Sequence, residues 1–254
     1  NVLMDIIASG IVPIVRLNTV FRQAAESGII SNAHRINTGQ FPQFNDRDVF
    51  FIERSEPEKA LDTIVEVVSS RLPKRFHLDP IRDIQVLAPM RRGEAGVSKL
   101  NEALREALNP KMERIGQRAF GLQDKVMQLR NNYELDVYNG DIGVIKQINH
   151  EIKELVVELD DRQVLYSFDN LDELALAYAS TVHKAQGSEY PAVVVPMLTE
   201  HYMMLQRNVL YTALTRASRI VVIVGDPKAI GRAVHNVRST RRNTRLCERL
   251  KNAL

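Results

Sequence analysis

The chain has 254 residues, 44% of them apolar, and a formal net charge of +3 with a sequence pI of about 9.0. This length and composition suffice for one or two domains with hydrophobic cores, and the mildly basic charge permits nucleic-acid binding without requiring it. The single cysteine excludes an internal disulfide, and no His/Cys cluster has metal-ligand spacing, so we predict no metal site. No apolar run approaches the roughly 20 residues of a membrane span, and no basic leader is visible, so the sequence predicts a cytoplasmic protein without membrane contact.

The first part of the sequence predicts helices that alternate with strands. We expect a helix over 1–9, a strand over 13–17, and a second helix after the cap Asn18-Thr19, with Arg22 in its first turn. A further helix over 28–37, a polar loop over 38–48 and a strand over 49–52 follow.

The next predicted helix begins near Pro57, because proline suits the first helical position, and we expect Pro73 to end it. A strand over 84–88 then leads into the loop Arg91-Arg92-Gly93 and a helix that carries Leu100, Leu104 and Leu108. A strand, a basic glycine-containing loop and a helix in this order are typical of a phosphate site.

The pattern changes near Gly116, after which short strands follow one another without helices. The pair Asn139-Gly140 marks a tight hairpin turn, and apolar runs over 142–148, 155–159 and 164–168 are separated by short polar turns. This spacing indicates a small antiparallel barrel. Three tyrosines in this region could stack on bases, although core packing or plain exposure is the expected role of each: Tyr133, Tyr138 and Tyr166.

Three apolar runs over 174–179, 192–197 and 220–224 alternate with two predicted helical segments. This β-α-β-α-β order predicts a buried parallel sheet with helices on its faces. Ligands of such sheets collect at the carboxyl ends of the strands, where Thr181, His183 and Lys184 follow the first run. We expect a phosphate there, at the amino end of the helix that follows.

Two segments of this region resemble motifs V and VI of superfamily 1 helicases, and most closely those of the RecD-like 5′-to-3′ DNA helicases. They read Thr181-Val-His-Lys-Ala-Gln-Gly-Ser-Glu189 and Tyr211-Thr-Ala-Leu-Thr-Arg-Ala217. Upstream, Val20-Phe-Arg-Gln-Ala24 resembles motif IV of the same helicases. The alternative interpretation of these segments is an ordinary strand–helix junction of an unrelated α/β protein.

The resemblance implies the fold class and the domain organisation. Residues 1–115 and 174–254 would form the second RecA-like motor domain, an α/β domain with a helix-flanked parallel sheet. Residues 116–173 would contribute linking strands and an inserted SH3-like antiparallel β-barrel.

The resemblance also implies roles for individual residues. Arg22 and Arg216 would reach the γ-phosphate of ATP, with Arg216 as an arginine finger. Glu189 would contact the nucleotide ribose, and Gly187 would let the backbone approach it closely. The residues expected to contact DNA phosphates are Thr181, His183, Lys184 (which could serve either site), and Arg91 or Arg92, for which plain solvation is the alternative.

The sequence lacks the Gly-x-x-x-x-Gly-Lys-Ser/Thr loop that cradles phosphates, and it lacks the acidic motif that holds Mg²⁺. We therefore expect a missing N-terminal RecA-like domain to hold ATP with Mg²⁺, and this chain alone to be inactive. The expected partners are that domain, single-stranded DNA, and recombination or repair subunits. The alternative is a non-catalytic nucleic-acid-binding module, such as the degenerate helicase domains of conjugative relaxases.

Overall fold

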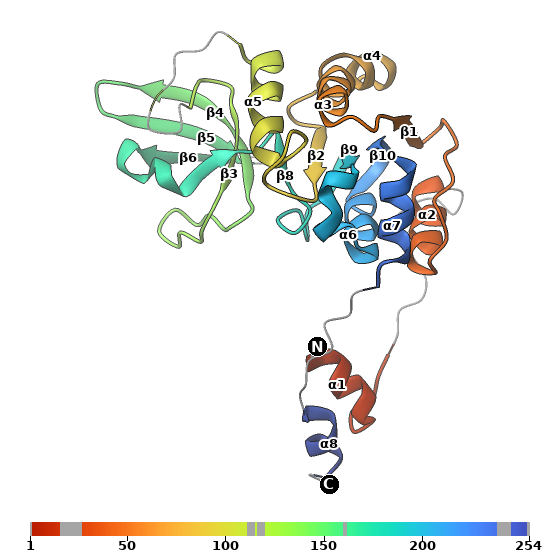
Figure 1. The fold of residues 1–254 in the computed structure, drawn as a ribbon. Coiled ribbons are helices and arrows are strands. Elements are labelled where there is room, and N and C mark those ends of the chain that lie inside the picture. Colours follow the sequence, from red (N-terminus) through yellow and green to blue (C-terminus); the bar gives the residue numbers. More distant parts are fainter. Residues whose placement is uncertain are drawn as a thin grey trace.

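Two five-stranded sheets form the centre of this computed structural model, which describes residues 2–15, 27–110, 115, 120–159, 162–237 and 245–252 (Figure 1). One sheet is parallel, with the strand order β1-β10-β9-β2-β8. Its strands are β1 (Val49–Glu53), β2 (Ile84–Ala88), β8 (Ala179–Thr181), β9 (Tyr190–Met197) and β10 (Ala217–Gly225). The prediction of a helix-flanked parallel sheet is confirmed.

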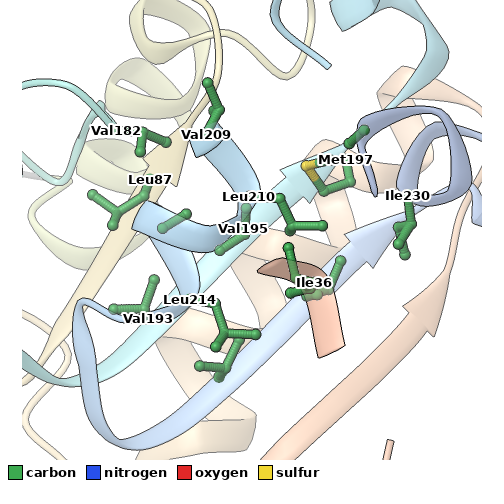
Figure 2. Close-up of a cluster of buried hydrophobic side chains, with 14 of the residues drawn as sticks. Ile36, Leu87, Val182, Val193, Val195, Met197, Val209, Leu210, Leu214 and Ile230 are labelled. Carbon is green, nitrogen blue, oxygen red and sulfur yellow. The ribbon is translucent and has the colours of Figure 1, made fainter. Parts of the chain in front are cut away.

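Helices cover both faces of the parallel sheet, because successive strand residues point to opposite faces and both sets are apolar. Val193 and Val195 face the side covered by α2 (Gly28–Asn37), α6 (Arg207–Leu214) and α7 (Pro227–His235), and Figure 2 shows this cluster. Val194 faces the other side, where α3 (Pro57–Glu66) and α5 (Val97–Leu108) pack. The result is a three-layer α/β domain with two separate cores.

The antiparallel sheet has the strand order β6-β5-β4-β3-β7 and stands beside the β8 edge of the parallel sheet (Figure 1). Its strands are β3 (Lys125–Gln128), β4 (Ile142–Asn149), β5 (Glu154–Leu159), β6 (Arg162–Ser167) and β7 (Leu174–Leu176), with a 3₁₀ segment η2 (Phe168–Glu173) before β7. Gly140 adopts φ +106° in the predicted tight turn between β3 and β4. Tyr166 is buried in the core of this sheet, as expected.

A buried polar seam joins the two sheets. The Lys125 Nζ of β3 donates a hydrogen bond to the Ile84 carbonyl of β2 at 3.0 Å, and the Tyr178 hydroxyl donates to Asp124 Oδ1 at 2.9 Å. Burial lowers the pKa of Lys125 to about 7, because a charged amine loses its hydration there. The negative charges of Asp79 and Asp83 act in the opposite direction and raise this pKa. The seam fixes the start of β3 against the start of β2.

The predicted single strand over 174–179 is wrong. Leu174–Leu176 pairs with β3 in the antiparallel sheet, whereas Ala179–Thr181 pairs with β2 in the parallel sheet. The chain passes from one sheet to the other through Ala177 and Tyr178, both buried. A continuous apolar run is compatible with either assignment, because periodicity does not show which sheet buries each residue.

Pro73 does not end the predicted helix. After α3 the chain continues through a wider turn, η1 (Val67–Arg71), and then through α4 (Leu72–Phe76). In the wider turn the Leu72 N–H bonds to the Val67 carbonyl five residues back. Pro73 has no N–H to place in the regular pattern, and the wider turn lies just before it. The helix ends instead at His77, which is left-handed with φ 55°.

The first helix is confirmed as α1 (Val2–Ser9), and α8 (Leu246–Lys251) lies against it, apart from the two sheets (Figure 1). Within the described residues 13–15 there is no strand. The rest of the predicted strand, the following helix and Arg22 fall in 16–26, outside the described residues. None of the described helices is long and apolar enough to cross a membrane.

Candidate functional site

The Arg216 guanidinium lies at the amino end of β10 and is fixed by three acceptors. Its Nη1 donates to the Ser188 carbonyl at 3.0 Å, its Nε to the Thr212 carbonyl at 3.3 Å, and its Nη2 to Thr215 Oγ1 at 3.4 Å. Its own carbonyl accepts from the Tyr190 N–H at 2.9 Å. These bonds hold a half-buried cation against the residues that lead into β9.

Glu189 and Gly187 lie in the same stretch, just before β9. Glu189 is exposed and lines a cleft of about 310 Å³, together with Ser188 and Tyr190. Gly187 adopts φ +94°, and no atom lies within 4 Å of the position that a Cβ would occupy. Glycine is therefore required here by the backbone conformation, while the space above it stays open. The structure thus brings together Arg216, Glu189 and Gly187.

Thr181 and His183 lie at the other end of the sheet, and Lys184 lies in the turns that follow. Thr181 is paired with Ala88 at the carboxyl ends of β8 and β2, and the Val182 N–H donates to the Ala88 carbonyl at 3.3 Å. His183 is exposed beyond this point. Arg91 and Arg92, in the loop that follows β2, are exposed at the same edge.

The loop after β2 has a defined shape. The Val97 N–H donates to the Met90 carbonyl at 3.1 Å, and the Ser98 N–H to the Arg91 carbonyl at 3.1 Å. Gly96 packs so closely that an added Cβ would lie 2.5 Å from the Arg92 backbone. On its outer side, Glu200 in the 3₁₀ segment η3 (Thr199–Met204) accepts from the Ala95 N–H at 3.3 Å. The loop therefore presents two arginines from a fixed backbone.

The predicted helix after Lys184 is wrong. Residues 182–187, all within the continuously described range 162–237, form a series of turns. The Lys184 N–H donates to the Thr181 carbonyl at 3.0 Å and the Ser188 N–H to the Ala185 carbonyl at 3.2 Å. A helix amino terminus therefore does not supply the expected phosphate site. Instead, the stretch 181–189, called here the 181–189 loop, runs from the carboxyl end of β8 to the amino end of β9.

Two features of this region were missed by sequence reasoning. Lys125 lines a second cleft, of about 540 Å³, that also includes Glu189 and Tyr190. A lysine at the start of a predicted strand is normally exposed to solvent, so no local signal in the sequence indicated that Lys125 is buried. The second is the turn around Gly140, where a Cβ would lie 3.6 Å from the Lys184 carbonyl. Its turn chemistry was predicted, but the contact depends on tertiary structure.

Of the three tyrosines considered for base stacking, Tyr133 is 78% exposed and Tyr138 is 45% exposed. Their rings pack edge to face with centroids 6.3 Å apart, and the Tyr138 hydroxyl donates to Asp136 at 2.8 Å. Both therefore have local packing partners.

The parallel sheet with its inserted antiparallel sheet has the architecture of a helicase C-terminal motor domain. The model of the UvrD-like helicase C-terminal domain matches residues 176–224, and that of the ATP-dependent RecD-like DNA helicase SH3 domain matches residues 100–159. The chain belongs to the RecD-like helicase family, of which it carries these two regions.

Among curated proteins, the chain is 34% identical over 241 residues to the ATP-dependent RecD2 DNA helicase of Deinococcus radiodurans, covering 94% of this chain and 32% of that protein. It is 29% identical over 183 residues to the RecBCD enzyme subunit RecD of Mycolicibacterium smegmatis, covering 71% and 31%. The chain thus spans about a third of the length of these relatives.

Two solved structures support the fold. Pif1 helicase from Candida albicans superposes with a TM-score of 0.53 at 17% identity, over 93% of this chain and 60% of that one. Pif1 from Bacteroides, solved with ADP-AlF3 and ssDNA, gives a TM-score of 0.51 at 17% identity, over 82% and 51%. At this identity the likeness concerns the fold alone.

Proposed function

We propose that the chain is the C-terminal part of an ATP-dependent DNA helicase, in which it forms the second RecA-like motor domain. That domain would comprise residues 1–115 and 174–254, with 116–173 as linking strands and the SH3-like insertion. The observation that carries the proposal is the clustering of Arg216, Glu189 and Gly187 at one end of the sheet, while Thr181 and His183 lie at the other.

The end that carries Arg216 suits a triphosphate. The Arg216 guanidinium donates to backbone carbonyls and a hydroxyl rather than to a carboxylate. Among the described bonds, no acid therefore neutralises its positive charge. Such a cation can stabilise charge on a transferring γ-phosphate, as an arginine finger does. Glu189 would accept from ribose hydroxyls, and Arg22 is the proposed second arginine.

ATP with Mg²⁺ would be held mainly by the preceding RecA-like domain of the parent protein, because the sequence of this chain has no phosphate-cradling loop. This chain would supply Arg216 and Glu189 across the interdomain cleft. Binding between the two domains would draw them together, and hydrolysis would release them.

The opposite end suits the backbone of single-stranded DNA. Arg91 and Arg92 offer cations, and Thr181 and His183 offer a hydroxyl and an imidazole at the same edge. Such contacts bind phosphates without reading sequence, as a translocating enzyme requires. Lys184 lies between the two ends and could serve either.

The parent protein and this chain are expected to differ in activity. The full-length protein should hydrolyse ATP faster with single-stranded DNA, whereas residues 1–254 alone should show no turnover above background. Steady-state phosphate release with and without oligonucleotide measures both. Robust DNA-stimulated turnover by this chain alone would refute the proposed division of labour, and a parent with DNA binding but no turnover would favour a non-catalytic binding module.

The proposed DNA edge predicts a salt effect. Replacing Arg92 by alanine in the full-length protein should weaken single-stranded DNA binding and reduce the slope of log K against log salt by about 0.7, since one phosphate contact is lost. Fluorescence anisotropy over a salt series measures both. The matched control is Lys74→Ala, an exposed lysine in α4, which precedes the amino end of β2. Equal slopes for Arg92→Ala, Arg91→Ala and wild type would remove this loop from the DNA site.

A further inference from the structure

The turn between β3 and β4 lies next to the 181–189 loop. A Cβ on Gly140 would lie 3.6 Å from the Lys184 carbonyl, which is van der Waals distance. The same turn faces the end of the loop, because Gly140 and Asp141 line the 310 Å³ cleft opposite Ser188 and Glu189. One turn of the SH3-like domain therefore lies against both the middle and the end of this loop.

This turn is held firmly to its own sheet. The Gly140 N–H donates to the Gln128 carbonyl at 2.9 Å, and the Gln128 N–H donates to the Asp141 carbonyl at 2.8 Å. The Asp141 carboxylate accepts from the Tyr138 N–H at 2.9 Å. Gly140 also adopts φ +106°, where a residue with a Cβ is strained. The turn is thus a fixed extension of strands β3 and β4.

The 181–189 loop is built differently. It consists of successive turns, with Val182 and Ala185 as its buried side chains and His183, Gln186, Gly187 and Glu189 exposed. A stretch without helix or strand depends on neighbouring surfaces for its shape. The two ends of this loop are also the two proposed sites. Thr181 and His183 lie at the DNA end. Glu189 lies at the nucleotide end, next to Ser188, whose carbonyl accepts from Arg216.

We propose that the 139–141 turn of the SH3-like domain positions the 181–189 loop and so couples the DNA end to the nucleotide end. Gly140 and Asp141 are positioning residues, since neither lies among the residues proposed to contact ligand. This inference rests on the proposed function. If the turn is displaced, DNA bound at the carboxyl ends of β2 and β8 no longer sets the position of Glu189 and Arg216.

The test is Gly140→Ala in the full-length protein. The new methyl group meets ordinary van der Waals contact, but the backbone must leave φ +106°, so the turn moves relative to the loop. The stimulation by single-stranded DNA, which is the ratio of the hydrolysis rates with and without DNA, should fall about tenfold, within the 5–150-fold range typical of coupling between sites. Stimulation equal to wild type would overturn the inference.

A matched control separates positioning from general destabilisation. Lys153 also has positive φ, 54°, in the turn between β4 and β5. Because β4 runs from Ile142 to Asn149, that turn lies about 23 Å away along the strand. Lys153→Val strains the same sheet there and should leave DNA stimulation unchanged at a comparable loss of melting temperature. An equal loss of stimulation in both variants would refute the proposal.

A milder variant covers the case in which Gly140→Ala does not fold. Asp141→Asn keeps the backbone and weakens the bond from the Tyr138 N–H, so it should show the same selective loss at a smaller size. If folded Asp141→Asn and Gly140→Ala proteins both show wild-type stimulation of ATP hydrolysis by DNA, the coupling role alone is refuted. If the wild-type parent shows no stimulation by DNA, the proposed function and this inference are refuted together.

Discussion

Arg216→Ala in the full-length protein should lower the rate of ATP hydrolysis by about 10³–10⁵-fold, the range found for arginine fingers. The guanidinium is fixed at the amino end of β10 by Ser188, Thr212 and Thr215. Affinity for single-stranded DNA should change by less than about twofold, because the proposed DNA residues lie at the carboxyl ends of β2 and β8. Single-turnover hydrolysis and anisotropy titrations measure the two effects separately.

Two further variants control this experiment. Arg216→Lys keeps the charge but loses the planar fork, so most of the rate should still be lost. Arg219→Ala removes an exposed arginine of the same strand and should leave the rate near wild type. Circular dichroism checks that each variant is folded. Loss of DNA binding with retained hydrolysis in Arg216→Ala would place this residue outside the nucleotide site.

Lys125→Met should alter the pH dependence of stability. Burial lowers the pKa of Lys125 from 10.5 to about 7, so the unfolded chain binds this proton more tightly than the folded one. Burial of Lys125 therefore lowers the free energy of unfolding by its full amount below pH 7, and this penalty decreases as the pH rises toward 10.5. A shift of this size corresponds to about 5 kcal/mol. The variant also leaves the Ile84 carbonyl without its bond, at a cost of about 1–3 kcal/mol.

The free energies of unfolding of Lys125→Met and wild type, plotted against pH, should therefore cross. At pH 7, urea unfolding should show Lys125→Met to be more stable than wild type by about 2–4 kcal/mol, and near pH 10 it should be the less stable protein. The chain has no tryptophan, so circular dichroism is the suitable signal. Lys99→Met, at an exposed position of α5, should change stability by less than about 0.5 kcal/mol at each pH. Parallel curves for Lys125→Met and wild type would contradict the burial of a neutral amine.

Local patterns predicted the elements that depend on local chemistry. Asp followed by Pro is typical of a helix start, and α7 begins at Asp226-Pro227, where the Asp226 side chain accepts from the Lys228 N–H at 2.7 Å. The run over 192–197 predicted β9, because a strand buried on both faces must be apolar throughout. The tight turn at Gly140 followed from residues that tolerate positive φ.

The errors lie where tertiary contacts override local preference. A strand–helix order was expected after Thr181, but the 181–189 loop is anchored by Val182 and Ala185 and turns at Gly187. For the candidate site, the resemblance grouped Arg216 with Glu189, and the structure brings them together. It could not show that Ser188 makes the link, since that bond joins residues 28 apart.

The antiparallel sheet begins at β3 and ends at β7, and these two strands pair directly, Val126 opposite Leu176. The polypeptide therefore departs from the α/β layer and returns to it at neighbouring points, an arrangement that suits interchangeable modules. Lengthening, shortening or exchanging what lies between would leave the order of the parallel strands intact. Grafted chimaeras that retain β3 and β7 as the splice sites are accordingly the natural way to give this α/β domain a different accessory domain.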